Sequence, residues 1–341
     1  MTRLLQAIAG QRHGGAEAFF ERLAVALAEA GETQRLVIRR DAARAARLRG
    51  AGLEVIEAPF GGPFDFATRK LLRRAVAAFR PEVVLSWMSR ASAACAGGDF
   101  VHVGRLGGYY PLKHYRGCDH LVANTRDIAA YIVRGGWPAA RVHYLPNFVA
   151  VTPAAPVARA ALDTPADAPL ALALGRLHPN KGFDVLLEAV AQVPRLQLWL
   201  AGAGDDGAAL AVRAAAPDLA GRVHFLGWRD DVPALLAAAD VLVVASRIEP
   251  LGNVVIEAWA AGVPVVATAS AGPRALIGDG RSGLLVPVED ADALAGALER
   301  VAADRGLAAA LVEGGRAAYA AEFAQERVVA LYRDFLAKVR R

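Results

Sequence analysis

The chain contains 341 residues, of which 55% are apolar, and its 39 basic and 34 acidic residues leave a net charge of +5. This composition excludes a disordered chain and suffices for two domains that each have a core. The two cysteines, Cys95 and Cys118, fit neither a disulfide framework nor a metal-binding spacing, so a reducing compartment is expected. No apolar run reaches the length of about 18 residues that suggests a membrane span. The opening MTRLLQAIAG is too short for a signal peptide, and we expect a cytoplasmic protein.

The first half alternates short apolar runs with helical patterns, which is typical of a parallel sheet built from βαβ units. Strands are predicted over residues 4–9, 34–38, 53–56, 83–86, 100–103, 120–123 and 142–145. The clearest helices between them are predicted over residues 16–30, 68–79 and 125–135. Residues 149–169 lose this periodicity and are rich in alanine and proline, which indicates a linker.

The second half restarts the same alternation, which predicts a second α/β domain. Its strands are predicted over residues 170–174, 197–201, 223–225, 241–245, 263–267 and 284–286. Its helices are predicted over residues 183–193, 232–238, 253–261 and 292–303, and two further helices over 307–321 and 325–339. Two successive α/β domains predict a cleft between them, where ligands commonly bind.

Charge is distributed unevenly between the two halves. Residues 1–150 carry a net charge of +9, and the remainder carries −4. A basic first half indicates that this half meets an anionic partner.

The strongest chemical signal is SRIEPLGNVVIEAWAAGVPVVA, residues 246–267. Glu249 lies in a loop after a predicted buried strand, and Gly252 and Asn253 then open a helix that carries Glu257 on its second turn. The start of that helix offers free backbone N–H groups and a positive dipole end, which suit a phosphate. Each glutamate can accept hydrogen bonds from sugar or ribose hydroxyls. The alternative is a loop charge and a solvated helix residue.

A second signal is LGRLHPNKGFDVLLEAV, residues 174–190, in which Arg176 follows a predicted strand and Lys181 directly precedes a helix. Two fixed cations there could hold a diphosphate and stabilise its charge as it departs. The alternative is a pair of exposed loop charges.

A third, weaker signal is the turn GQRHGGAEAFF after the first predicted strand. Gly14 and Gly15 would let the backbone approach a ligand closely at the start of the next helix. A glycine turn without a ligand is the alternative at this place.

Together these motifs resemble family 4 of the retaining glycosyltransferases, which have the GT-B architecture. The matching segments are GGAE at 14–17, LPN at 145–147, GRLHPNKG at 175–182, AGAGDD at 201–206 and EPLGNVVIEAWAAGVPVVA at 249–267. The resemblance implies an α/β fold with two Rossmann-like domains facing a central cleft. We expect an acceptor-binding domain at 1–148, a linker at 149–169, a donor-binding domain at 170–322 and a C-terminal helix at 323–341 that packs back toward the first domain.

The resemblance also assigns roles at the donor, with Arg176 and Lys181 on the diphosphate, Glu257 on the ribose and Glu249 on the sugar hydroxyls. Of these, Arg176, Lys181 and Glu249 are the expected catalytic residues. Backbone contacts to the donor are expected from Leu251, Gly252, Asn253, Gly14 and Gly15.

One region departs from the family pattern, because residues 85–92, LSWMSRAS, lack the histidine that many members carry there. His102 and Arg105 remain candidates on the acceptor side. A structural role is the alternative for a histidine beside a strand.

Two further motifs are better accounted for by local structure than by ligand binding. Residues 202–207, GAGDDG, match a dinucleotide-binding pattern, but Asp205 and Asp206 would repel a pyrophosphate, so a tight turn is predicted. Asp290 and Asp292 form a D-x-D, which binds metal in other glycosyltransferases, but their position before a helix favours capping. We therefore expect no metal and no cofactor.

The sequence thus predicts a retaining, metal-independent enzyme that moves a hexose-type sugar from a nucleoside diphosphate sugar, expected to be a UDP-sugar. The expected acceptor is a hydroxyl of a cell-envelope glycan or glycolipid such as lipopolysaccharide. The alternatives are another GT-B enzyme such as a sugar-nucleotide epimerase, or a sugar-nucleotide-binding protein without catalysis.

The predicted helix over 68–79 carries Arg69, Lys70, Arg73 and Arg74 near one flank. Such a helix suits a peripheral contact with anionic lipid at the inner face of the plasma membrane, or is an ordinary amphipathic surface helix. The sequence lacks the interleaved aromatic and basic residues that nucleic-acid binding uses, so nucleic acid is not expected as a partner.

Overall fold

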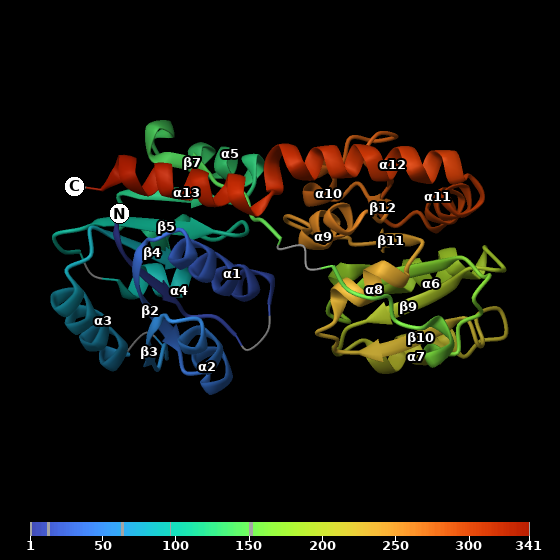
Figure 1. The fold of residues 1–341 in the computed structure, drawn as a ribbon, viewed down its shortest axis with the longest axis horizontal. Helices are drawn as coiled ribbons and strands as arrows, with labels where there is room; N and C mark the ends of the chain where they lie inside the picture. Colours follow the sequence, from blue (N-terminus) through green and yellow to red (C-terminus); the bar gives the residue numbers. More distant parts are fainter. Residues whose placement is uncertain (1, 12–13, 63–64, 96, 150–152, 341) are drawn as a thin grey trace. The chain divides into compact units, whose positions relative to one another are not determined.

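The computed structural model describes residues 2–11, 14–62, 65–95, 97–149 and 153–340. The chain divides into two compact units. Unit 1 comprises Met1–Ala150 together with Phe323–Arg341, and unit 2 comprises Val151–Glu322. Each unit is a parallel sheet covered by helices (Figure 1).

The sheet of unit 1 has the strand order β3-β2-β1-β4-β5-β6-β7, and all its neighbouring strands are parallel. The order reverses between β1 and β4, which lie side by side although two strands separate them in sequence. The strands are β1 Arg3–Ile8, β2 Thr33–Arg39, β3 Glu54–Ala58, β4 Val83–Trp87, β5 Val101–Leu106, β6 His120–Ala123 and β7 Val142–Tyr144.

Helices cover both faces of this sheet. Along β1, Leu4 and Ile8 pack in one apolar cluster with α1 and α13, whereas Leu5 and Ala7 pack in another with α3. Alternate side chains of a strand point to opposite faces, so both faces of β1 are buried, and four of its six residues are apolar. The helices of unit 1 are α1 Gly15–Glu29, α2 Ala42–Gly50, α3 Phe66–Phe79, α4 Met88–Ala94, α5 Arg126–Arg134 and α13 Gln325–Val339.

The sheet of unit 2 has the order β10-β9-β8-β11-β12-β13, again with parallel neighbours. Its order reverses between β8 and β11. The strands are β8 Leu170–Leu174, β9 Gln197–Ala201, β10 Val223–Gly227, β11 Val241–Val244, β12 Val265–Thr268 and β13 Leu284–Val286. The helices are α6 Phe183–Ala191, α7 Gly207–Ala214, α8 Val232–Ala238, α9 Asn253–Ala261, α10 Ala271–Leu276, α11 Ala291–Ala303 and α12 Arg305–Ala318.

The last helix, α13, belongs to the core of unit 1 although it follows all of unit 2 in sequence. Its buried residues Val328, Tyr332 and Leu336 lie in the same cluster as Phe19 and Leu23 of α1. After α12, a π-helical turn over Tyr319–Phe323 leads the chain into this helix. Unit 1 is therefore built from both ends of the described chain.

The segment expected to be a linker packs largely on unit 2. Val157 N–H donates to Ala234 O at 3.1 Å, and the Arg159 guanidinium donates to Ala238 O and Asp240. Indole Nε1 of Trp199 donates to Thr164 Oγ1 at 2.8 Å. Residues 153–169 are thus fixed to the second unit by specific bonds, which their low periodicity did not indicate.

Candidate active site

The strand order of unit 2 marks where a ligand is expected. In open parallel sheets, ligands bind beyond the carboxyl ends of the strands at the point where the strand order reverses, because the loops there diverge and leave a crevice. In unit 2 that point lies between β8 and β11. The loop after β8 carries Arg176 and Lys181, and the loop after β11 carries Glu249.

The structure brings Lys181 and Glu249 into direct contact. Nζ of Lys181 lies 2.5 Å from Oε2 of Glu249, and the other carboxylate oxygen accepts from Gly252 N–H at 3.1 Å. The side chains are 24% and 13% exposed, so the pair is partly shielded from solvent. The sequence placed both residues at the donor but did not predict that they bond to each other.

The two loops approach so closely that one position tolerates only glycine. Gly182 has φ of +62°, and a Cβ there would lie 2.2 Å from the carbonyl oxygen of Ala245. Ile248 N–H also donates to Asn180 O at 3.1 Å. These backbone contacts fix Lys181 beside the loop that carries Glu249.

A salt-bridge network outside the predicted site strengthens this junction. The Arg247 guanidinium donates to both carboxylate oxygens of Asp184 at 2.9 and 2.8 Å, to Glu289 at 2.5 Å and to Pro179 O at 2.8 Å. Bonding to Arg247 lowers the pKa of the Asp184 carboxyl. The sequence motifs gave Arg247 no role, and the only indication of one was the position of this cation two residues before Glu249.

Arg176 has a different environment from Lys181. It is exposed, and the structure gives it no hydrogen bond or ion pair with any residue that it describes. Its loop rests on the turn after β9, where a Cβ on Gly202 would lie 1.8 Å from Gly175 O and one on Gly204 would lie 2.2 Å from Leu177 O. The G-x-G-x-x-G match is thus a tight turn, as predicted, and its glycines permit close packing under the Arg176 loop.

The start of α9 carries the remaining residues that the sequence predicts to contact the donor. Gly252 is left-handed, with φ of +88°, and caps the helix that begins at Asn253. Glu257 lies one turn further on and is half-buried, and Leu251 before the helix is 4% exposed. Backbone N–H groups at such a helix start attract anions.

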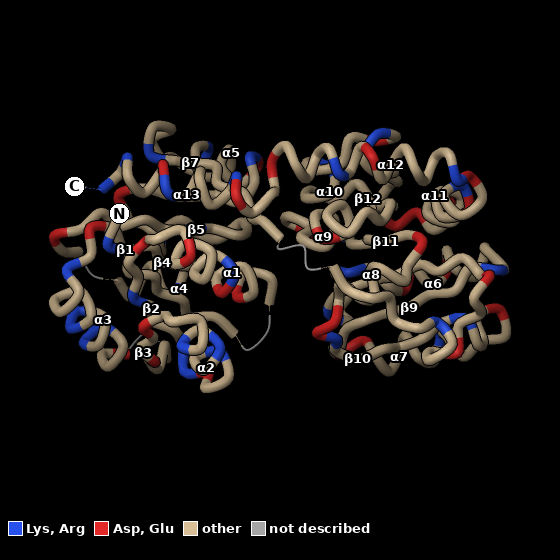
Figure 2. Tube along the Cα trace, viewed as in Figure 1, with Lys and Arg blue, Asp and Glu red and all other residues tan. Residues whose placement is uncertain are grey.

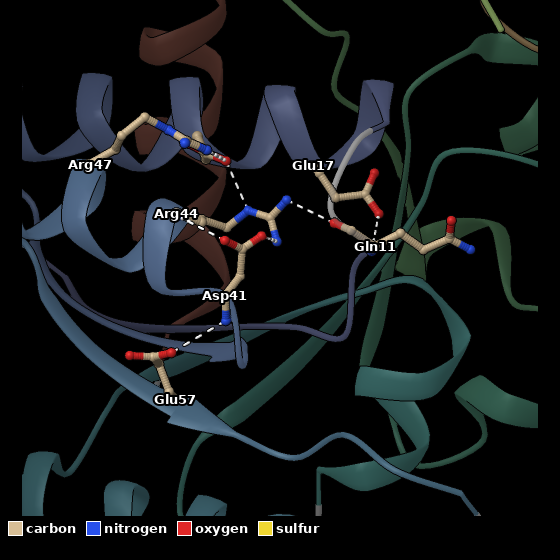
Figure 3. Close-up of polar contacts among 7 residues, drawn as sticks. Gln11, Glu17, Asp41, Arg44, Arg47 and Glu57 are labelled. Atoms are coloured by element: carbon tan, nitrogen blue, oxygen red, sulfur yellow. Dashed lines mark hydrogen bonds and ion pairs between the residues drawn. The ribbon is translucent and has the colours of Figure 1, made fainter. Parts of the chain in front are cut away.

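In unit 1 the corresponding reversal lies between β1 and β4, and the glycine turn follows β1. Gly14 precedes α1 in an extended conformation, and Gly15 is exposed at the first position of the helix. Glu17 is buried beneath them, 7% exposed, and its Oε1 accepts from Gln11 N–H at 2.8 Å (Figure 3). The glycine turn therefore lies at the strand reversal of unit 1, after β1, whose counterpart in unit 2 is β8.

The two acceptor-side candidates lie inside unit 1. His102 is 1% exposed, its Nδ1 is 3.0 Å from Gly117 O and its Nε2 is 2.8 Å from Ser86 Oγ. Burial lowers the pKa of its imidazole, which favours the neutral form of the ring. This geometry gives His102 the structural role that the sequence left open as the alternative.

Arg105 is also buried, with 2% exposure, so its side chain is not exposed for a contact with an acceptor. Its guanidinium lies over the rings of Phe19 and Trp87, with 4.8 and 4.4 Å to the ring centres. It donates to Tyr332 Oη at 3.0 Å and to Asn147 Oδ1. Aromatic faces stabilise a desolvated cation, so Arg105 ties the end of β5 to α13.

The D-x-D residues have ordinary partners. Asp290 caps α11, because its Oδ1 accepts from Ala293 N–H at 2.9 Å, and Asp292 accepts from Gln192 Nε2 at 2.9 Å. The prediction that the motif caps a helix is confirmed for Asp290, whereas Asp292 bonds to Gln192.

Comparisons with known proteins agree with this geometry. Residues 13–152 match the model of the Glycosyltransferase Family 4 domain, and residues 168–304 match that of Glycosyl transferases group 1. The chain is 38% identical over 340 residues to the lipopolysaccharide core biosynthesis glycosyltransferase LpsE of Rhizobium meliloti (strain 1021), covering 96% of both chains. It is 35% identical over 325 residues to LpsD of the same organism, covering 94% of both.

Among solved structures, HepE from Anabaena in complex with UDP and glucose superposes with a TM-score of 0.85 at 21% identity, covering 99% of this chain and all of the other. No helix within the described residues is long and apolar enough to cross a membrane. The matching family models, the close full-length relatives and the two parallel-sheet units together show that the chain belongs to the family 4, group 1 glycosyltransferases and has their GT-B fold.

Proposed function

We propose that the enzyme transfers a hexose-type sugar from a UDP-sugar, with retention of anomeric configuration, to a hydroxyl of lipopolysaccharide or a related cell-envelope glycolipid. The observation that carries the donor assignment is the Lys181–Glu249 pair at the strand reversal of unit 2, with the exposed Arg176 on the same loop as Lys181. The complexes of HepE with UDP and glucose and the names of LpsE and LpsD support the choice of nucleotide and acceptor.

In this proposal the two cations bind the diphosphate. Arg176 can give its guanidinium to the phosphates without leaving a partner among the residues that the structure describes, and Lys181 can donate to a phosphate while it stays bonded to Glu249. Glu257 then binds the ribose, and Glu249 binds hydroxyls of the transferred sugar. The backbone of Leu251, Gly252 and Asn253 contacts the same sugar and phosphate.

The chemistry follows from where charge develops. The departing diphosphate gains negative charge in the transition state, and fixed cations in a partly dry site stabilise that charge. We propose that Arg176, Lys181 and the start of α9 take the electrostatic part that a metal ion has in other glycosyltransferases. Retention is then accounted for by a front-face reaction, in which the leaving phosphate helps to deprotonate the acceptor hydroxyl.

We propose that the membrane that carries the acceptor contacts the exposed face of α3. Arg69, Lys70, Arg73 and Arg74 are all exposed there, and Phe66 at the start of the helix is 69% exposed. Figure 2 shows Lys and Arg positions along α3. Cations near an anionic membrane contribute roughly 1 kcal/mol each, and an exposed aromatic side chain can enter the interface. The enzyme would then work at the inner face of the plasma membrane without a membrane span.

The test is a transfer assay with UDP-glucose, UDP-galactose and GDP-mannose against lipopolysaccharide that lacks its outer sugars, with the product analysed by NMR. We expect one UDP-sugar to be used and the anomeric configuration to be kept. An inverted product would refute the retaining mechanism, and transfer from GDP-mannose alone would refute the proposed nucleotide. Arg176→Ala should abolish most of this activity, whereas Arg195→Ala, which removes a 72% exposed cation outside the site, should not.

A further inference from the structure

The loop that follows β5 carries an exposed tyrosine at the carboxyl edge of the sheet of unit 1. β5 ends at Leu106, and Tyr109 comes after two glycines and is 42% exposed. The neighbouring parallel strand β6 ends at Ala123, and the chain then enters α5, which carries Asp127. Ligands of open parallel sheets bind beyond the carboxyl ends of the strands. Both residues therefore lie at the edge of unit 1 where a ligand is expected.

The ring of Tyr109 is fixed although it is exposed. The rings of Tyr109 and Tyr131 meet edge to face, with 5.4 Å between their centroids and 84° between their planes. The Tyr109 hydroxyl donates to Oδ2 of Asp127. Tyr131 packs against the apolar cluster of β6 and α5, and its own hydroxyl donates to Tyr110 O at 3.0 Å. A ring that is held before a ligand arrives loses little conformational entropy on binding.

Asp127 supplies a carboxylate beside this ring. Thr125, rather than Asp127, caps α5, because Thr125 Oγ1 accepts from Ile128 N–H at 3.0 Å. Asp127 lies on the first turn of the helix and is exposed. Its Oδ2 accepts from Tyr109, and the two oxygens of an ionised carboxylate can together accept about four hydrogen bonds. The group can therefore accept from hydroxyls of a ligand while it holds Tyr109.

A buried amide lies beside the same loop. Asn124 directly follows β6 and is 4% exposed, and a Cβ on Gly107 would lie 3.7 Å from its Nδ2. Its Oδ1 has no hydrogen-bond partner among the residues that the structure describes. Buried polar atoms are nearly always bonded, so this oxygen requires an explanation. A ligand that brings hydroxyl donors to this loop supplies one.

A sugar ring has the chemistry that these groups match. One face of a pyranose presents C–H groups, which stack on an aromatic ring, and its edge presents hydroxyls, which donate to carboxylate and amide oxygens. Tyrosine combines an apolar face with a polar tip, and here the tip is bonded to Asp127 while the ring is exposed.

We propose that Tyr109 and Asp127 form a sugar-binding platform on unit 1, which takes a sugar ring of the acceptor glycan. This inference rests on the proposed glycan acceptor. It gives unit 1 an exposed contact with the acceptor, which the buried His102 and Arg105 do not offer. The effect belongs to acceptor affinity, because the residues assigned to the nucleotide and its diphosphate belong to unit 2.

Three variants and one control test the platform. Tyr109→Ala removes the ring, Tyr109→Phe keeps the ring without its bond to Asp127, and Asp127→Ala removes the carboxylate. Val133→Ala is the control, because Val133 is an exposed apolar residue of the same helix, at 39%, and has no part in the platform. Thermal unfolding of each variant shows whether the fold is retained.

The first measurement is steady-state transfer to deacylated lipopolysaccharide that lacks its outer sugars, a soluble probe that removes membrane binding from the assay. Tyr109→Ala and Asp127→Ala should each raise the KM for this acceptor roughly tenfold, and Tyr109→Phe by about threefold at most. The kcat at saturating acceptor and the KM for the UDP-sugar should stay within about twofold of the wild type. Val133→Ala should leave all three constants unchanged. A merely structural role of Tyr109 would lower kcat or the melting temperature instead.

The second measurement is calorimetric titration of the same oligosaccharide into the enzyme without donor. The Kd should rise with the acceptor KM in Tyr109→Ala and Asp127→Ala. The proposal is overturned if Tyr109→Ala keeps both constants within about twofold of the wild type, or if Val133→Ala weakens binding as much. If the wild type transfers no sugar but binds the oligosaccharide through Tyr109, the proposed function fails and the platform stands. If the wild type transfers sugar and Tyr109→Ala matches it, only the platform fails.

Discussion

Replacement of Lys181 by alanine should separate catalysis from stability. The side chain belongs to an ion pair with Glu249 that is partly exposed, at 24% and 13%. Such pairs contribute about 0–1 kcal/mol to folding, which corresponds to a melting-temperature change of about 2–4 °C at most for a unit of this size. Loss of a cation from the departing diphosphate costs about 2.7–4 kcal/mol, which is roughly 10²–10³-fold in rate.

The two effects therefore differ enough to be resolved in one preparation. UDP release measured with a coupled assay gives kcat/KM, and thermal unfolding gives the stability of the same sample. Arg195→Ala serves as the control, because it removes an exposed cation paired with Asp167 in the same unit. Near-normal kcat/KM for Lys181→Ala would refute the donor site. If Lys181→Ala loses activity and its melting temperature also falls by many degrees, the role of Lys181 is structural instead.

Three further outcomes are expected. Activity should persist after dialysis against EDTA, and a complete loss that manganese or magnesium restores would refute the metal-free electrostatics. The protein should sediment with anionic liposomes at low salt and be released near half-molar salt, where screening shortens the range of electrostatic attraction to a few ångströms. Replacement of Arg69, Lys70, Arg73 and Arg74 by glutamate should abolish this binding and leave the affinity for UDP intact. Burial and the neighbouring His120 and Lys338 lower the pKa of His143 to about 4. Unit 1 should therefore lose stability as the pH falls from 6.5 toward 4, because His143 is protonated in the unfolded chain but not in the folded chain over this range. Thermal unfolding of His143→Phe should depend less on acid pH, and an unchanged dependence would assign the effect to other groups.

The fold was predictable because its strands are buried on both faces. Runs such as Leu170–Leu174 and Gln197–Ala201 are nearly continuous apolar segments, and the predicted bounds agree with β8 and β9. Helix starts were harder to predict, since α3 begins at Phe66, two residues before the predicted start, where Asp65 caps it. A cap depends on a side-chain bond, which periodicity does not report.

Buried charges were the main features that the sequence did not reveal. Arg44 and Arg105 look like surface cations in an arginine-rich chain, yet they are 1% and 2% exposed. Their partners lie far away in sequence, such as Tyr332, which is 227 residues from Arg105. Only the tertiary fold brings such groups together, so no local pattern could have identified them.

The place of α13 also determines the order in which the protein can be completed during synthesis. Unit 2 holds every strand and helix of its core within one continuous stretch, so it can fold once that stretch has left the ribosome. Unit 1 begins earlier but lacks Tyr332 and Leu336 until all of unit 2 has been translated, which leaves Phe19 and its neighbours uncovered. The half that is made first is therefore finished last, and a fragment that ends at the unit boundary near residue 150 should be aggregation-prone.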